Sequence, residues 1–159
     1  MTRTIISSLA LILAVASVTN AQTWNPVLAP EGPLTVVYDP ADGNVSVTLD
    51  SIQLSTFELR GTDLFSGSAL NIGGIFDVAS TEKLFKLDPA GFGSIDFGPA
   101  MVTGLSASDW ESNVAVNGSI LTGGPLPSPI ALQIVPEPAS VLLTGMIGLI
   151  GLLKIRRRS

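Results

Sequence analysis

The sequence predicts an all-β domain, an antiparallel β-sandwich, between two apolar ends. Two observations on residues 22–135 predict it. Short runs of alternating apolar and polar residues recur at intervals of about ten residues, with Gly, Pro or Asp between them, a pattern typical of sandwiches and barrels. No run in this stretch keeps the apolar spacing of an amphipathic helix, so we expect no helix there.

The clearest strands stand at the beginning of this domain. Residues 34–38 and 45–49 alternate and are rich in Val and Thr, and an Asp-Gly turn at residues 39–44 separates them. This arrangement predicts a hairpin. Further strands are expected at residues 56–59, 74–78, 83–87, 94–97, 113–116 and 130–135, with Ile120 lying beyond a turn at Asn117-Gly118.

Composition limits the chemistry that this domain can perform. Between residues 22 and 135, three basic residues oppose twelve acidic ones, a net charge of −9. Because such a domain repels phosphate backbones, we expect no nucleic-acid partner. The chain has no Cys and no His, so it lacks disulfides, the usual ligands of zinc, haem and iron–sulfur clusters, and the base of the His-dependent nucleophile systems. We therefore expect no cofactor and no enzymatic activity.

The N-terminal end reads as a secretion signal. Arg3 precedes an uncharged apolar stretch at residues 5–16, and small residues at positions 19 and 21 fit a signal peptidase site. We expect residues 1–21 to be a signal peptide, cleaved by signal peptidase between Ala21 and Gln22. The alternative is a retained membrane anchor, although the apolar stretch is short for one.

The C-terminal end, residues 136–159, has three parts in a fixed order. Pro136-Glu137-Pro138 forms an extended segment, because proline is incompatible with a helix interior. The apolar residues 139–153 follow as an expected transmembrane helix, about 22 Å long. The basic tail, residues 154–159, holds this end on the cytoplasmic side of the membrane through Lys154, Arg156, Arg157 and Arg158.

These three parts resemble the PEP-CTERM sorting signal, in which a Pro-Glu-Pro motif precedes a membrane helix and an arginine cluster. The resemblance implies processing by an exosortase-type enzyme, transient residence in the inner membrane, and final placement at the cell surface or outside the cell. It also implies a Gram-negative-type bacterium. Many of these bacteria make exopolysaccharide and biofilm matrix, so exopolysaccharide is a further partner to test. A simple tail-anchored periplasmic domain is the alternative reading of the same residues.

The central domain, residues 22–135, carries less specific signals. Its pattern is loosely similar to cohesin-like or carbohydrate-binding-module-like sandwiches, and we expect a structural or interaction protein of the extracellular matrix. A carbohydrate-binding module is the alternative. The rings suited to a wet sugar-binding surface are those of Trp24, Tyr38 and Trp110.

Acidic residues suggest two further sites, each with a simpler explanation. Asp39, Asp42 and Asn44 lie in one turn and could hold calcium, although Asp and Asn in turns usually cap their own backbone.

Carboxylate pairs of the kind that glycoside hydrolysis needs would form if Asp109 and Glu111 shared a strand face, or if Asp88 and Asp96 lay on paired strands. Chance pairs are common in an acidic domain, so we expect no catalytic residue.

Overall fold

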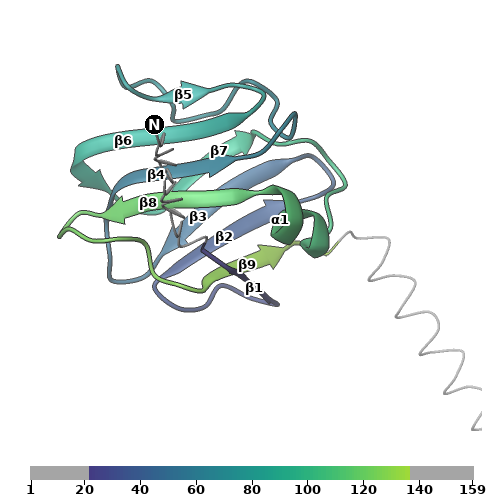
Figure 1. Ribbon diagram of the computed structural model, residues 1–159, viewed down its shortest axis with the longest axis horizontal. Helices are drawn as coiled ribbons and strands as arrows, with labels where there is room; N and C mark the ends of the chain where they lie inside the picture. The colour runs from purple at the N-terminus through teal and green to yellow at the C-terminus, as the bar shows by residue number, and fades with distance from the viewer. Residues whose placement is uncertain (1–21, 137–159) are drawn as a thin grey trace, which may run out of the picture.

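The computed structural model describes residues 22–136, which fold into nine strands and one short helix (Figure 1). The expected signal peptide, Glu137, Pro138, the expected membrane helix and the basic tail lie outside the described residues. Among residues 22–136, no helix is long and apolar enough to cross a membrane.

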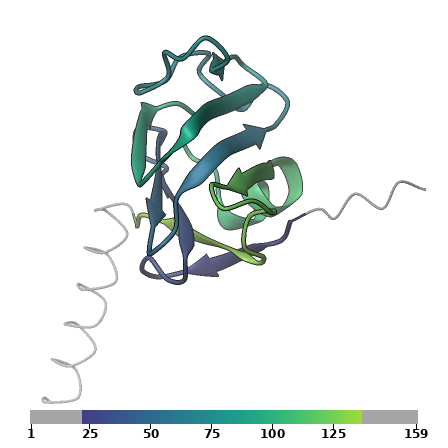
Figure 2. The same cartoon turned by 90° about the vertical axis from the view of Figure 1, so that its left-hand side faces the viewer.

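The strands form two sheets, as the two views in Figures 1 and 2 show. The two sheets enclose one hydrophobic core. The five-stranded sheet has the order β1 (Trp24–Val27), β9 (Ile130–Ile134), β2 (Leu34–Asp39), β3 (Asn44–Leu49) and β7 (Ile95–Pro99). The four-stranded sheet has the order β5 (Val78–Ala79), β6 (Lys83–Phe92), β4 (Leu54–Arg60) and β8 (Ala115–Ile120). The mostly-β prediction is therefore confirmed.

The predicted hairpin is present between β2 and β3, which pair antiparallel from Leu34↔Leu49 to Asp39↔Asn44. Its alternation sorts side chains between the core and the surface. Val36 and Tyr38 are fully buried, as is Val45 on the neighbouring strand.

The expectation of purely antiparallel sheets is wrong for one strand. β9 lies between β1 and β2 and pairs parallel with both, whereas all pairs of the four-stranded sheet are antiparallel. A parallel pair needs a long crossover connection. Alternation along β9 gives no information about which strand lies beside it.

Three local expectations also need correction. Residues 74–78 are mostly loop, with β5 beginning only at Val78. A helix, α1 (Ala107–Asn113), occupies the start of the strand expected at residues 113–116. β8 continues through Asn117-Gly118, where a turn was expected, and a Cβ on Gly118 would lie 2.5 Å from the Thr56 carbonyl oxygen, so glycine permits close pairing with β4.

The core joins the two sheets through large apolar side chains. Phe57 of β4 stacks on Phe97 of β7 with ring centroids 6.1 Å apart, and both rings are fully buried. Burial of each such side chain stabilises the fold by roughly 1.5–3 kcal/mol.

Candidate functional site

The three rings expected to bind sugar do meet, but inside the core. Trp24 and Trp110 pack edge to face at 5.2 Å, and Tyr38 lies 5.3 Å from Trp110 between ring centroids. Trp24 is 9% exposed and the other two are 0% exposed. The predicted exposed platform is therefore wrong: α1 directs Trp110 inward, and the other two rings pack against it.

Hydrogen bonds fix two of these rings in place. Trp24 Nε1 donates to the Val114 carbonyl oxygen at 2.8 Å. The Tyr38 hydroxyl donates to the Val102 carbonyl oxygen at 2.6 Å and accepts from the Leu105 N–H at 3.2 Å. Burial raises the pKa of the Tyr38 phenol, so the ring stays neutral and both hydrogen bonds are kept.

The turn considered for calcium uses its carboxylates on its own backbone. Asp39 Oδ1 accepts the Ala41 N–H at 2.9 Å, and Asp42 Oδ1 accepts the Asn44 N–H at 2.8 Å. Such bonds are the usual role of Asp in turns. Among residues 22–136, no group of three or more Asp, Glu, His or Cys side chains is arranged to hold a metal ion.

The first of the two candidate carboxylate pairs falls on helix α1 instead of a strand. Positions two apart on a helix do not face each other, so Asp109 and Glu111 diverge. Asp109 completes a capping box with Ser106. Hydrogen bonds from the Ser106 hydroxyl and backbone N–H lower the pKa of Asp109.

The second pair is separated by the topology, because Asp88 lies on β6 and Asp96 on β7, in different sheets. Each carboxylate accepts a backbone N–H two residues further along the chain: Ala90 for Asp88 and Gly98 for Asp96. Neither pair is therefore arranged as the sequence argument required, on one strand face or on two paired strands.

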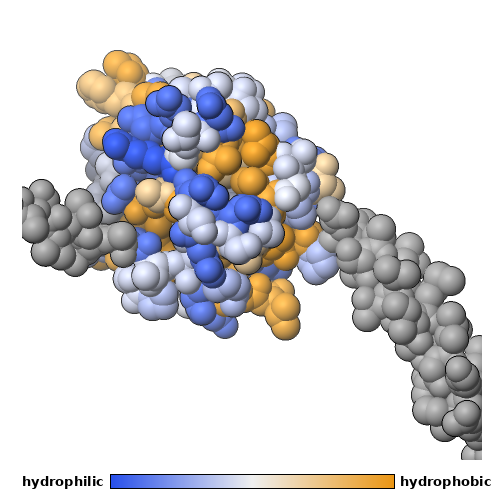
Figure 3. Space-filling view, turned by 45° about the vertical axis from the view of Figure 1, so that its right-hand side comes forward, coloured by the Kyte–Doolittle hydropathy of each residue, from blue (hydrophilic) through white to orange (hydrophobic). Residues whose placement is uncertain are grey.

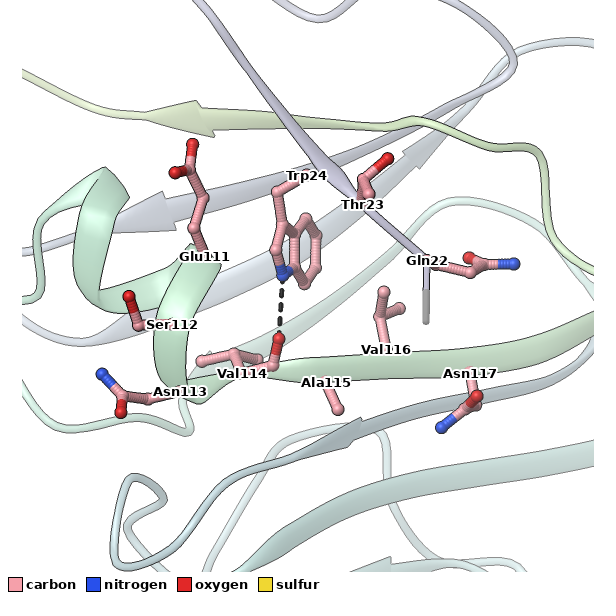
Figure 4. A pocket seen from close by; sticks show the side chains of 10 residues that line it. All are labelled: Gln22, Thr23, Trp24, Glu111, Ser112, Asn113, Val114, Ala115, Val116 and Asn117. Carbon is pink, nitrogen blue, oxygen red and sulfur yellow. Dashed lines mark hydrogen bonds between the residues drawn. The ribbon is translucent and has the colours of Figure 1, made fainter. Parts of the chain in front are cut away.

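A groove between β1 and β8 is the candidate site that the geometry provides (Figure 4). These two strands end their respective sheets. The groove is open to solvent and has a volume of about 700 Å³. We call it the β1–β8 groove; its lining residues are Gln22, Thr23, Trp24, Glu111, Ser112, Asn113, Val114, Ala115, Val116 and Asn117.

The groove has an apolar floor and polar rims. Trp24 and the buried Val114 and Val116 form an apolar floor, tied across the groove by the indole hydrogen bond that Figure 4 shows. Glu111 and Asn117 stand at the exposed rims. The sequence contained one signal for α1: Ser106-x-x-Asp109 has the spacing of a capping box, which marks the start of a helix. That signal would have placed Glu111 inside the helix that begins after Ser106.

Gln22, the residue after the expected cleavage site, also lines the groove. Its Nε2 donates to the Leu126 carbonyl oxygen at 3.1 Å. Its Oε1 is buried and has no hydrogen-bond donor among the described residues. Of the sorting motif, only Pro136 is described, and it is exposed directly after Val135.

A second cluster that sequence reasoning missed surrounds Asp77. Its carboxylate accepts the N–H groups of Gly73, Gly74 and Leu87 at 2.9–3.1 Å, and Lys86 Nζ lies 3.5 Å away. Burial alone would raise the pKa of Asp77, but these hydrogen bonds and the lysine charge outweigh it and lower the pKa.

The Asp77 cluster holds a loop that displays Ile75 and Phe76, which are 95% and 66% exposed. Apolar atoms also reach the surface at separate places on the face shown in Figure 3. Scattered exposed apolar residues are ordinary on protein surfaces, so this loop does not by itself define a ligand.

No family model, curated protein or solved structure matches this chain.

Proposed function

We propose that the chain is an exported, non-enzymatic interaction or structural protein of the cell surface or extracellular matrix, sorted by an exosortase-type enzyme. The observation that carries the proposal is the order of elements in the tail: Pro136-Glu137-Pro138, an apolar stretch at 139–153, and a basic end at 154–159. An export signal at residues 1–21 gives the chain one orientation, with the β domain outside and the basic end inside.

The position of the β domain between the two expected cleavage points supports this proposal. β1 begins at Trp24, two residues after Gln22. β9 ends at Ile134, and the Val135 N–H donates to the Tyr38 carbonyl oxygen at 2.9 Å. Cleavage at either point would therefore leave every strand of the domain intact, and Pro136 would be accessible to an enzyme.

The positions and hydrogen bonds of the carboxylates support the proposal that the chain is not an enzyme. The candidate catalytic pairs are separated, and Asp88, Asp96 and Asp109 each cap local backbone. Carboxylates used in this way stabilise turns and helix ends.

The likeness to cohesin-like or carbohydrate-binding-module-like sandwiches is part of the proposal, and the two-sheet arrangement supports it. Of the alternatives, the simple tail-anchored periplasmic domain uses the same tail residues and differs only in keeping them. The carbohydrate-binding alternative loses its ring platform and would need another surface.

The sorting role is tested by substitution within the motif. We expect Glu137→Ala to leave the chain in the inner-membrane fraction with its mass extending to Ser159, whereas the unaltered chain leaves that fraction. Glu82→Ala, at an exposed position of the β domain, is the matched control and is expected to be sorted normally. If Glu137→Ala were shortened and exported like the control, Pro-Glu-Pro would not be the recognised element.

A further inference from the structure

We infer that the β1–β8 groove binds a neutral oligosaccharide, which lies along the edge strand β8 and hydrogen-bonds to side chains on both rims. This inference names a partner for the interaction role proposed above. It rests on that proposal only for the place where the ligand is met.

The size of the groove fits a ligand of a few sugar rings. Its volume of about 700 Å³ falls within the range of about 300–1,000 Å³ typical of small-molecule sites. Because β1 and β8 are the last strands of their sheets, no described strand continues either sheet beyond the groove.

The lining chemistry favours a ligand that is rich in hydroxyl groups. Six of the ten lining residues end in an amide, a hydroxyl or a carboxylate: Gln22, Thr23, Glu111, Ser112, Asn113 and Asn117. An amide both donates and accepts hydrogen bonds, and a carboxylate accepts at two oxygens, so these groups suit neighbouring sugar hydroxyls.

Charge favours a neutral sugar over an acidic one. Glu111 is the one charged side chain in the lining, and no basic residue is present there. Signal cleavage before Gln22 would add one countercharge to the groove, the α-ammonium group of that residue, but an anionic polymer would still meet a domain whose side chains carry a net charge of −9.

The floor of the groove is already held in the geometry that a ligand would meet. Trp24 is fixed by its hydrogen bond to Val114 and by edge-to-face contact with Trp110. A rigid floor reduces the entropy lost on binding. At 9% exposure, Trp24 offers an apolar strip for the C–H groups of one sugar instead of an open stacking platform.

The unpartnered oxygen of Gln22 indicates where a donor is missing. Gln22 Oε1 is buried without a donor among residues 22–136, although Nε2 of the same side chain is hydrogen-bonded. Buried acceptors in native proteins almost always have a donor. A sugar hydroxyl can supply one here only if the Gln22 side chain turns toward the groove, because the oxygen is buried; Trp110 Nε1 is a second buried atom without a partner among residues 22–136. An extended peptide pairing with the edge of β8 is the competing ligand, and it is therefore one arm of the test.

Binding is tested with the protein purified from its host, in the processed form that the host produces. We would screen neutral glucan, mannan, galactan and rhamnan hexasaccharides, with uronate oligomers and an extended peptide as the other arms. Titrations would follow the fluorescence of the two tryptophans. We expect a neutral hexasaccharide to bind, and the double variant Glu111→Gln/Asn117→Ala to weaken it by about tenfold or more.

The matched control is Glu82→Gln, between β5 and β6 at the opposite edge of the four-stranded sheet from β8; it should bind like the unaltered chain. Equal unfolding midpoints for all variants would show that the fold is kept. Binding limited to uronates or to the peptide, no binding in any arm, or unchanged affinity in the double variant would overturn the inference. A sorting defect leaves this assay unaffected, so the two proposals fail separately.

Discussion

At the scale of single residues, the turn between β2 and β3 depends on Gly43. Its φ is +76°, and a Cβ at this position would lie 2.0 Å from the Met101 carbonyl oxygen. Its N–H donates to the Asp39 carbonyl oxygen, and its own carbonyl accepts the Met101 N–H. The Asp-Gly turn could be read from the sequence, whereas the approach of residue 101 could not, because that contact is set by tertiary packing.

We expect Gly43→Ala to lower the free energy of unfolding by more than the roughly 1–2 kcal/mol that a left-handed backbone costs an L-residue, since the new methyl also meets Met101. Urea unfolding followed by tryptophan fluorescence measures the loss. Gly32→Ala is the matched control, with a φ of +70° and no atom within 4 Å. Equal losses in the two variants would show that the contact with Met101 has no cost.

Asp77 makes part of the free energy of unfolding sensitive to acid. Because the fold lowers the pKa of Asp77, the unfolded chain binds a proton first as the pH falls. The contribution of Asp77 is complete above the ordinary carboxyl pKa of about 4 and is lost as the pH falls through the lower folded value.

We expect Asp77→Asn to be less stable than the unaltered chain at pH 7, and the difference to shrink as the pH falls below about 4. Unfolding curves at several pH values measure this. Asp50→Asn, at an exposed carboxylate, is the control. A difference between Asp77→Asn and the unaltered chain that stays constant down to the lowest pH would show that the Asp77 charge contributes nothing.

At the scale of elements, helix α1 positions both Trp110 and the rim residue Glu111. Ser106 caps its first turn, accepting from the Asp109 N–H at 3.3 Å. We expect Ser106→Ala to cost about 0.5–2 kcal/mol of stability and to alter the near-ultraviolet circular dichroism of the buried Trp110. Ser106→Asn should restore most of the loss, since Asn is also a good N-cap.

If Ser106→Ala left both the stability and the tryptophan signal unchanged, the capping box would not be what holds α1. A matched substitution, Ser112→Ala, lies at an exposed position of the same helix and tests for a general effect of removing a serine hydroxyl; Ser108 is unsuitable because its hydroxyl is hydrogen-bonded to that of Ser106 at 2.9 Å.

The elements also show how far sequence reasoning reaches. The β2–β3 hairpin was predictable because its pairing is local and its turn residues are diagnostic. The parallel pairing of β9 and the meeting of Trp24 with Trp110 were not, because they join residues that are far apart in the chain. The groove could not be predicted for the same reason, since Gln22 and Asn117 both line it but lie far apart in the chain.

At the scale of the whole molecule, a folded β domain lies between two segments to which we assign export and sorting. In the function that we propose, export removes residues 1–21, and sorting depends on recognition of Pro136-Glu137-Pro138. The domain keeps its core without disulfides, since the chain has no cysteine, and its net charge of −9 between residues 22 and 135 favours solubility among anionic polymers.

The proposed export and sorting are tested together by the intact mass of the protein purified from its native host and by the cell fraction that contains it. We expect a chain that begins at Gln22 and ends between Pro136 and Ala139, found outside the inner membrane. A chain that still carries Ser159 and stays in the membrane fraction would contradict this expectation.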